Sequence, residues 1–465
     1  MNIYLHVEIS ARELDSKLLL ATLAASKGHE IIVSSLEVIE KGLIKGWLPS
    51  GIFHTKSLTP SKTKIFRHEE ILNSGSKITS IDEETSIDRF GYEDFSKQRY
   101  SDKTIEQSSA VFTWGDEDFE TLKKNYTNYS SKIYKTGSPR ADLWKSSFTD
   151  YWVTPKKIPT KPFLLISSNM HVCANISFKE RIRKMRDTGY FDRSPDLFKE
   201  RFILSSNDYL KAIIFIEAIK HLSKNNNGYD IVFRPHPSES VDCWKVLLEG
   251  ISNVHVIREG AINSWVKNSF AVMHHACTTA IECSVSQKPL VTYVDSELKD
   301  HLFHNTLSNQ LGHLVDSKEN LLQKINSLYD EAKLNLPKKN TDKLSPHILK
   351  KIYLDDNEFA AEKMITIWEN ILNNKPHKPI NLIKLRFFIF KMKINRLIGY
   401  ILSKLFLSKL TNFRAHKNNE KFAPLDFKEI TNSVSRLQEI LSLDKDIECK
   451  LISDRTVLIK SKNNK

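Results

Sequence analysis

The chain has 465 residues, of which 40% are hydrophobic, so it is long enough to bury the cores of two or three globular domains. Its formal net charge of +13 indicates an acidic partner, which leaves nucleic acid, an anionic membrane and a phosphorylated ligand open. We find no apolar run long enough for a membrane-spanning helix and no basic leader typical of a signal peptide.

The cysteines are scattered and form no CxxC pair: Cys173, Cys243, Cys277, Cys283 and Cys449. An odd, scattered set favours reduced thiols over a disulfide framework, and therefore a cytoplasmic protein.

The amino-terminal residues predict a βαβ unit. Residues 3–7 and 31–33 are apolar, β-rich runs, and residues 14–27 between them have helical periodicity. The turn after the first strand lacks the glycine fingerprint of dinucleotide-binding folds, so a dinucleotide is not expected there. Glu8 and Arg12 follow the first strand, where they either face a ligand or lie in a solvated loop.

Residues 77–81 predict another strand, with three acidic residues, Asp82, Glu83 and Glu84, directly after it. Adjacent carboxylates repel one another, which tends to raise the pKa of at least one of them. A carboxylate tuned in this way can act as a general base. We therefore consider Glu83 or Glu84 as the base, and Glu8 as a less favoured one; the alternative is an acidic turn in water.

Two further strand-to-loop units follow, at residues 110–115 and 132–142. The second contains a tight turn around Ser138, and Arg140 after it is a candidate anion contact. A proline-rich stretch at residues 151–162 with few hydrophobic residues is the expected interdomain linker.

The second domain begins with a predicted strand at residues 163–167 that ends in Ser168 and Asn169. A helix is expected at 208–225. Beyond it, apolar runs alternate with helical segments and predict βαβ units on a parallel sheet. These runs and segments are 231–233, 262–267, 270–273, 279–286 and 290–294.

Two polar motifs stand where strands of this sheet end, and ligands bind beyond the carboxyl ends of such strands. The first is Arg234-Pro235-His236-Pro237-Ser238, in which prolines fix the backbone around a histidine that can donate to a phosphate oxygen. The second is the pair Thr278 and Thr279 at a helix start, which suits a phosphate or serves only as a cap. Together they suggest a bound nucleotide ester.

A metal site is weighed because several metal-ligating side chains cluster in the second motif: His274, His275, Cys277, Glu282 and Cys283. Their spacing matches no zinc pattern, and adjacent strand residues point to opposite faces. A Cys277 nucleophile is also disfavoured, since nothing identifies an acyl substrate. Nucleic acid fits the charge, but we recognise no binding fold for it. We expect no metal, no cofactor and no nucleic acid.

Residues 380–410 contain basic and apolar residues, several of them aromatic, and no acidic residue. A basic amphipathic helix of this kind is suited to lie on an anionic membrane surface. The alternative is a core helix whose lysines extend to solvent. The tail at residues 421–465 predicts a small helical element and a strand.

These motifs resemble those of bacterial sialyltransferases and β-Kdo transferases, which are GT-B glycosyltransferases. The residues around His236 look like their His-Pro motif, which contacts the CMP part of the donor. Cys277-Thr278-Thr279 is similar to their Ser/Thr motif, which binds the donor phosphate. Asp82-Glu83-Glu84-Thr85 resembles their acidic motif, although Thr85 replaces its glycine. Over residues 1–375 the chain most resembles the bacterial surface carbohydrate biosynthesis proteins.

The resemblance implies an α/β, GT-B fold in which two Rossmann-like domains face a central cleft. The boundaries that we predict are 1–155 for the acceptor domain, 156–375 for the donor domain, 376–420 for the membrane-associating helix and 421–465 for the tail. The helical residues 342–373 could return to the first domain.

The implied function is metal-independent transfer of a sugar, such as a CMP-activated ulosonic acid, to a glycan or lipid-linked glycan at the inner face of the cytoplasmic membrane. The implied catalytic residues are Glu83, Glu84, His236 and Glu8. The implied donor-binding residues are Arg234, His236, Pro237, Ser238, Thr278, Thr279 and Glu282. Other cleft residues are Arg12, Ser138, Arg140, Ser168, Asn169 and His275. Alternatives are a CDP-glycerol or CDP-ribitol transferase related to teichoic acid polymerases, a UDP-sugar epimerase, which we discount for want of a Gly-rich turn, and a non-catalytic membrane scaffold.

Overall fold

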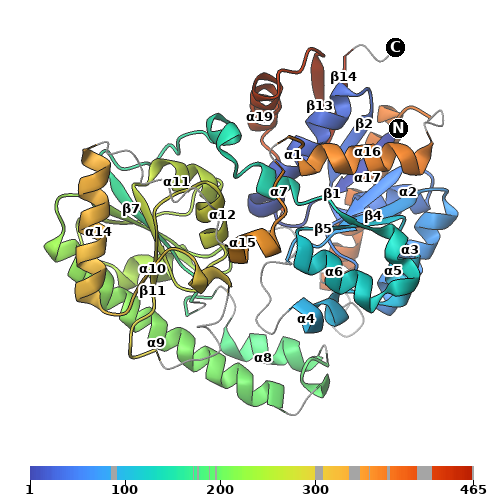
Figure 1. The fold of residues 1–465 in the computed structure, drawn as a ribbon. Coiled ribbons are helices and arrows are strands. Elements are labelled where there is room, and N and C mark those ends of the chain that lie inside the picture. The colour runs from blue at the N-terminus through green and yellow to red at the C-terminus, as the bar shows by residue number, and fades with distance from the viewer. Residues whose placement is uncertain are drawn as a thin grey trace. The chain divides into compact units, whose positions relative to one another are not determined.

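The protein is described by a computed structural model, shown in Figure 1. The structure describes residues 1–84, 92–170, 172–174, 177–187, 189–193, 196–298, 307–334, 346–355, 357–373, 378–405 and 422–462. The chain divides into two compact units, one formed by Met1–Tyr151 with Leu349–Lys465 and the other by Trp152–Ile348. Each unit is a helix-covered, mostly parallel sheet, as expected for a pair of Rossmann-like domains.

The first unit contains an eight-stranded sheet in the order β13-β14-β2-β1-β3-β4-β5-β6. Its strands are β1 (Asn2–His6), β2 (Glu30–Ser34), β3 (Ile52–Thr55), β4 (Lys77–Ile81), β5 (Ala110–Thr113), β6 (Ile133–Lys135), β13 (Ile447–Ser453) and β14 (Thr456–Ser461). The strands β1 to β6 are parallel, whereas β14 is antiparallel to β2 and to β13. Strands β1 to β5 carry the apolar runs that the sequence pattern predicts, and they are almost wholly buried.

The helices of the first unit are α1 (Ser10–Ser26), α2 (Leu36–Ile44), α3 (Lys62–Asn73), α4 (Tyr92–Arg99), α5 (Asp102–Glu106), α6 (Asp116–Asn125), α7 (Pro139–Asp142), α16 (Ala360–Leu372), α17 (Leu382–Leu405) and α19 (Phe427–Ile440). The division of the chain between the two units falls within the sequence of helix α15 (Pro346–Lys351).

The carboxyl-terminal residues belong to the first unit instead of forming a separate tail. The red strands β13 and β14 lie beside the blue strand β2 in Figure 1, because β14 pairs with β2 over five residues. Helix α16 also returns to this unit, where the indole of Trp368 donates to the hydroxyl of Thr79 on β4 at 3.0 Å. The boundary therefore falls after Ile348, earlier than the position 375 predicted from sequence.

The second unit contains a six-stranded parallel sheet in the order β12-β11-β10-β7-β8-β9. Its strands are β7 (Phe163–Ser167), β8 (Asp230–Arg234), β9 (Val254–Val256), β10 (Ala271–His274), β11 (Leu290–Tyr293) and β12 (His313–Val315). Its helices are α8 (Phe178–Asp187), α9 (Asp196–Asn225), α10 (Val241–Leu247), α11 (Ile262–Asn268), α12 (Thr279–Val285) and α14 (Lys318–Lys333). The order matches the 3-2-1-4-5-6 order of dinucleotide-binding Rossmann sheets.

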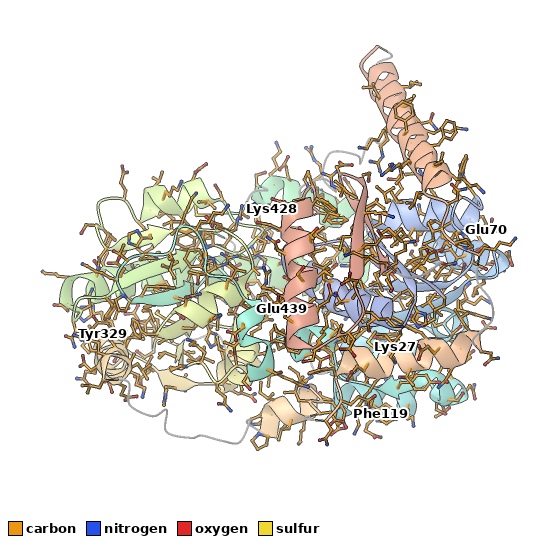
Figure 2. All side chains as sticks on the ribbon, turned by 90° about the horizontal axis from the view of Figure 1, so that it is seen from above. Lys27, Glu70, Phe119, Tyr329, Lys428 and Glu439 are labelled. Atoms are coloured by element: carbon orange, nitrogen blue, oxygen red, sulfur yellow. A yellow bond between two sulfur atoms is a disulfide. The ribbon has the colours of Figure 1, made fainter. Side chains whose placement is uncertain are left out.

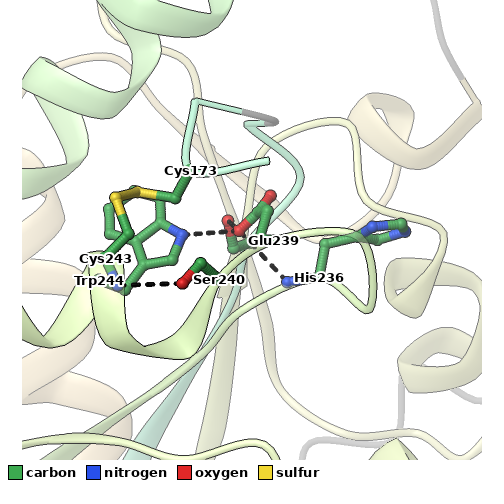
Figure 3. Close-up of a disulfide and its surroundings, with 7 residues drawn as sticks. Cys173, His236, Glu239, Ser240, Cys243 and Trp244 are labelled. Atoms are coloured by element: carbon green, nitrogen blue, oxygen red, sulfur yellow. Dashed lines mark hydrogen bonds between the residues drawn. A yellow bond between two sulfur atoms is a disulfide. The ribbon is translucent and has the colours of Figure 1, made fainter. Parts of the chain in front are cut away.

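Two of the cysteines form a disulfide, which differs from the expectation of five reduced thiols. Cys173 and Cys243 are bonded, with their Cα atoms 5.8 Å apart (Figure 3). No local pattern predicts this pairing, because the two cysteines are 70 residues apart and are brought together only by the fold. Cys277, Cys283 and Cys449 carry free thiols.

Candidate functional site

In the second unit, the predicted polar motifs lie at the point where the sheet reverses its direction of growth. From β7 the chain adds β8 and β9 on one side and then β10, β11 and β12 on the other. In such sheets the ends of the two strands on either side of the reversal diverge and leave a crevice where ligands bind. The residues after β7 and β10 flank this reversal, and those after β8 lie one strand away.

Consecutive residues at the end of β7 connect the two motifs. The hydroxyl of Ser167 lies 3.1 Å from the Cys277 sulfur and 3.3 Å from the Thr279 hydroxyl. The hydroxyl of the next residue, Ser168, donates to the carboxylate of Glu239 at 2.7 Å. Two hydroxyls in succession thus hold the threonine loop on one side and the histidine loop on the other.

The histidine loop is built around the buried carboxylate of Glu239. Besides Ser168, this carboxylate accepts from the backbone N–H groups of Met170 at 3.0 Å and His236 at 3.3 Å, and from the Trp244 indole at 2.8 Å. These four hydrogen bonds fix the loop. Figure 3 shows the His236 ring pointing away from Glu239 and the disulfide.

The tautomer of His236 follows from its neighbour. The backbone N–H of Ser238 donates to His236 Nδ1 at 3.2 Å, and the Ser238 hydroxyl lies 2.7 Å from the same atom. Because Nδ1 accepts a hydrogen bond, the neutral ring carries its proton on Nε2. The partly exposed imidazole is therefore set to donate from Nε2.

The threonine loop is held in a strained conformation. Ala276 has a φ of 51°, in the left-handed region that alanine rarely adopts. Its carbonyl accepts from the side-chain amide of Asn169 at 2.7 Å, and its N–H donates to the side-chain carbonyl of Asn309 at 2.6 Å. These contacts present Thr278 at the start of α12 with its side chain partly exposed, whereas Thr279 is buried against Ser167.

Several predicted donor-site residues have structural partners. Arg234 is buried and donates to the carbonyls of Glu259 at 2.7 Å and Gly260 at 2.5 Å. Burial and then the charge of Arg258 lower the pKa of Arg234 to about 10, so it is still protonated at neutral pH. Glu282 and His275 are also buried, whereas Pro237 is exposed beside His236.

The residues that we weighed as metal ligands or nucleophiles are enclosed. His274 contacts the hydroxyl of Thr292 at 2.9 Å, and burial lowers its pKa to about 3, so its ring is neutral. Burial raises the pKa of the Cys277 thiol, which disfavours a thiolate nucleophile. Within the described part of the chain, no group of three or more metal-ligating side chains gathers.

In the first unit, a cluster of charged residues lies where its sheet reverses direction, between β1 and β3. The Glu8 carboxylate after β1 lies 2.5 Å from the ammonium group of Lys56 after β3. Glu84 after β4 lies 3.7 Å from Lys56, 3.5 Å from Arg12 and 3.3 Å from Arg99. The predicted residues Glu8, Arg12 and Glu84 therefore meet.

Glu83 forms the buried half of this cluster. Its carboxylate lies 2.8 Å from Lys17 Nζ and 3.7 Å from Arg140, and Lys17 and Glu83 are both almost inaccessible. Burial raises the pKa of Glu83, but Lys17 and Arg140 lower it by a larger amount, so the net pKa is below its usual value. A buried, ionised and paired carboxylate is poorly placed to take a proton from an acceptor, which disfavours Glu83 as the base.

Glu84 is the more accessible of the two proposed bases. Its side chain is one-third exposed. Burial raises its pKa, but Arg99, Lys56 and Arg12 together lower it below the ordinary value. Asp82 behaves in the opposite way: burial raises its pKa although the carboxylate forms a bidentate ion pair with Arg99. The expected rise in one of the three acids thus falls on Asp82, and its main cause is burial.

Arg140 and Ser138 belong to the rim of the same cluster. Arg140 donates to the Glu83 carbonyl at 3.2 Å and lies over the rings of Trp114 and Trp144. Ser138 is buried and caps α7 by accepting from the Arg140 N–H at 3.2 Å. Thr85 lies outside the described residues.

Sequence reasoning overlooked the partners of the predicted residues, above all Lys17, Lys56 and Arg99. Lys17 had a recognisable signal, because it is a charged residue directly before the buried run of leucines in α1. Glu239 follows the histidine motif directly, but nothing in the pattern marks it as the residue that organises the loop.

No family model and no curated protein matches the sequence. Solved structures share a general likeness. S. aureus MnaA with UDP is 13% identical, with a TM-score of 0.44, over 82% of this chain and 98% of that one. Methanocaldococcus jannaschii UDP-GlcNAc 2-epimerase with UDP-GlcNAc and UDP is 14% identical, with a TM-score of 0.44, over 80% and 100%. The wall teichoic acid polymerase TagF is 10% identical, with a TM-score of 0.41, over 81% and 90%. At these values we draw neither family nor function from the likeness.

Proposed function

We propose that the chain is a glycosyltransferase of bacterial surface polysaccharide biosynthesis that transfers a sugar from a nucleotide donor to a glycan acceptor, with a CMP-activated ulosonic acid as the expected donor. One observation carries the proposal: the threonine motif lies at the reversal point of a Rossmann-like sheet and the histidine motif lies one strand away. Ser167 binds the threonine loop and Ser168 binds the histidine loop. The resemblance of these motifs to those of CMP-sugar transferases supports the choice of donor.

In this proposal the second unit binds the donor nucleotide. His236 Nε2 and the Thr278 hydroxyl donate to phosphate oxygens and stabilise the charge that builds up on the departing nucleotide. Both side chains are partly exposed, which lets a ligand reach them. Glu239 and Ser238 act by positioning, because they hold the backbone and the ring of His236.

The first unit supplies the general base in this proposal. Glu84 is the preferred candidate, because it is ionised at neutral pH and accessible, and Glu8 is the second. The surrounding cations Arg12, Lys56 and Arg99 hold Glu84 in place. The chemistry requires no metal: the leaving nucleotide is stabilised by hydrogen bonds, and the carboxylate takes the acceptor proton.

A thermal-shift screen against CMP, CDP, UDP and GDP tests the donor. A ligand present at about 100 times its Kd stabilises the native state by about 2.7 kcal/mol. We expect the largest shift with CMP. A preference for CDP would favour a polyol-phosphate transferase, and a preference for UDP would favour sugar-nucleotide chemistry of another kind. Absence of any shift would favour a non-catalytic scaffold.

The variant His236→Ala tests the site itself. Loss of one hydrogen bond to a charged phosphate costs about 1.5–3 kcal/mol, which raises the nucleotide Kd roughly 10- to 100-fold and should abolish transfer. His255→Ala is the matched control, because His255 is a partly exposed histidine of the same unit that pairs with Asp230 at the opposite end of β8. Equal nucleotide affinity in both variants would remove His236 from the site.

A further inference from the structure

Helix α17 has two apolar faces, and only one of them is buried. Leu385, Phe388 and Ile389 pack into a core cluster with residues of α2 and the sheet. A second set recurs at intervals of three and four residues and is exposed by 38–83%: Ile383, Phe387, Phe390, Ile394, Leu397 and Ile398. We name this set the α17 stripe. At about 100° per residue, the stripe lies on the side of the helix opposite the buried face.

The stripe is flanked by positive charge on both sides. Lys384 and Lys391 fall along one edge of it, and Arg386 and Lys393 along the other, at the same helical pitch. No acidic residue occurs between 380 and 410. Figure 2 shows α17 projecting from the first unit. An apolar stripe between two basic edges is the pattern of a helix that lies in a membrane interface.

A groove next to α17 adds a second, independent feature. It has a volume of about 340 Å³, within the range of about 300–1,000 Å³ of ligand pockets. Its walls are Trp47, Phe388 and Met392, and its charged residues are Lys41, Lys45, Lys391, Arg396 and a single acid, Glu37. Helices α2 and α17 and the residues after α2 thus form a pocket with an apolar floor and a net charge of +3.

Two of these cations are not used by the protein. Glu37 pairs with Lys41 at 2.7 Å and with Arg396, so these two cations share its single negative charge. Lys45 and Lys391 are exposed and form no ion pair with any residue that the structure describes. They present two ammonium groups at the groove beside an apolar surface.

We propose that α17 docks on an anionic lipid bilayer, with the α17 stripe inserted at the level of the acyl chains and the phosphate of one anionic phospholipid bound in the groove by Lys45 and Lys391. Charge complementarity selects this occupant: a protein partner would need an apolar strip framed by acids, whereas a bilayer rich in phosphatidylglycerol offers both chemistries at fixed depth. The inference stands apart from the proposed function, because none of these residues lies in either candidate site.

Vesicle co-sedimentation of the full chain tests the proposal. We expect binding to vesicles of phosphatidylcholine with phosphatidylglycerol and little binding to phosphatidylcholine alone. The double variant Lys45→Ala/Lys391→Ala should weaken binding roughly 25-fold, about fivefold for each lysine, and make it less sensitive to salt. The control is Lys62→Ala/Lys77→Ala, which removes two exposed lysines elsewhere on the same unit and should leave binding unchanged.

The stripe is tested by Phe387→Ser/Phe390→Ser, with Phe66→Ser as control, because Phe66 on α3 is 62% exposed on the same unit. The stripe variant should abolish sedimentation with vesicles, while melting temperature and nucleotide-induced shifts stay as in the parent. Binding that is independent of phosphatidylglycerol, or that survives both double variants, overturns the proposal. So does a stripe variant that only converts an oligomer to a monomer. A failed nucleotide screen would leave this result untouched.

Discussion

The two units place polar residues at equivalent positions of related sheets but satisfy them in opposite ways. In the first unit the charges compensate one another: Lys17 with Glu83, Lys56 with Glu8, and Arg99 with Asp82. In the second unit neutral hydroxyls, an indole and backbone N–H groups donate hydrogen bonds to the buried carboxylate of Glu239. A compensated cluster holds a carboxylate ionised and in place, whereas an edge of hydroxyls and N–H groups suits an incoming anion.

The comparison predicts that Glu84→Gln removes chemistry without removing donor binding. Loss of a general base lowers turnover about 10²- to 10⁴-fold. Because Glu84 belongs to the first unit, the nucleotide-induced thermal shift should be unchanged. Turnover is measured as sugar transfer or release of CMP from the donor. The control is Glu93→Gln, which changes an exposed glutamate on α4.

Burial raises the pKa of Glu84, but the cations Arg99, Lys56 and Arg12 lower it below its ordinary value. The rate should therefore stay level as the pH falls from neutrality toward that ordinary value of about 4.3. If the Glu84→Gln variant turned over as fast as the parent, Glu8 would become the candidate base, and substituting Glu8 would then be the decisive test.

The buried pair of the first unit should be the most sensitive to a single change. Lys17→Met leaves the Glu83 carboxylate buried with the more distant Arg140 as its ion-pair partner, and removing one partner of such a pair costs about 3–5 kcal/mol. Urea denaturation measures the loss. The double variant Lys17→Met/Glu83→Leu should recover most of it, because an apolar pair of similar volume replaces both charges. A small loss in the single variant would mean that water already reaches Glu83.

Acid should destabilise the first unit more steeply than the second. Burial lowers the pKa of His6 to about 3, with a smaller effect of Lys56, and that of His68 to about 4. His54 is lowered as well, chiefly by burial. An unfolded histidine has a pKa of about 6.5, so as the pH falls from 6.5 toward 4 the unfolded chain takes up protons that the folded chain refuses. Stability is thus lost by about 1.4 kcal/mol per pH unit for each such histidine.

Among the described residues of the second unit, burial lowers the pKa of the fully buried His274 to about 3. The pKa of His313 is lowered less, and again chiefly by burial. Pulse proteolysis in urea at about pH 7 and about pH 5, with fragments assigned to each unit by mass spectrometry, measures the two slopes. His68→Gln should reduce the proton uptake on unfolding of the first unit by about one proton, and the slope of its stability against pH should become shallower accordingly. Equal slopes for the two units would show that the histidines of the first unit are protonated in the folded state.

The sequence anticipated the sheets better than the side-chain partners, and the reason is physical. Strands such as Ile231 to Phe233 are continuous apolar runs with strand propensity, which is a local property. Glu83 has two basic partners, Lys17 and Arg140. They lie 66 and 57 residues away from it along the chain, and no local pattern encodes such a contact. The Cys173–Cys243 bond and the pairing of β14 with β2 were missed for the same reason. The roles of His236 and Thr278 stay predictions.

The smallest effects that we predict separate the two hydroxyls at the end of β7. Ser168 donates to the buried carboxylate of Glu239, and a hydrogen bond to a charged group is worth about 1.5–3 kcal/mol. The Ser167 hydroxyl contacts the neutral side chains of Cys277 and Thr279, and a hydrogen bond between neutral groups is worth about 0.5–1.5 kcal/mol. Ser168→Ala should therefore destabilise the second unit more than Ser167→Ala in urea denaturation. Both should weaken nucleotide binding, because each hydroxyl holds one of the two loops; if Ser167→Ala left the affinity unchanged, the threonine loop would not take part in binding.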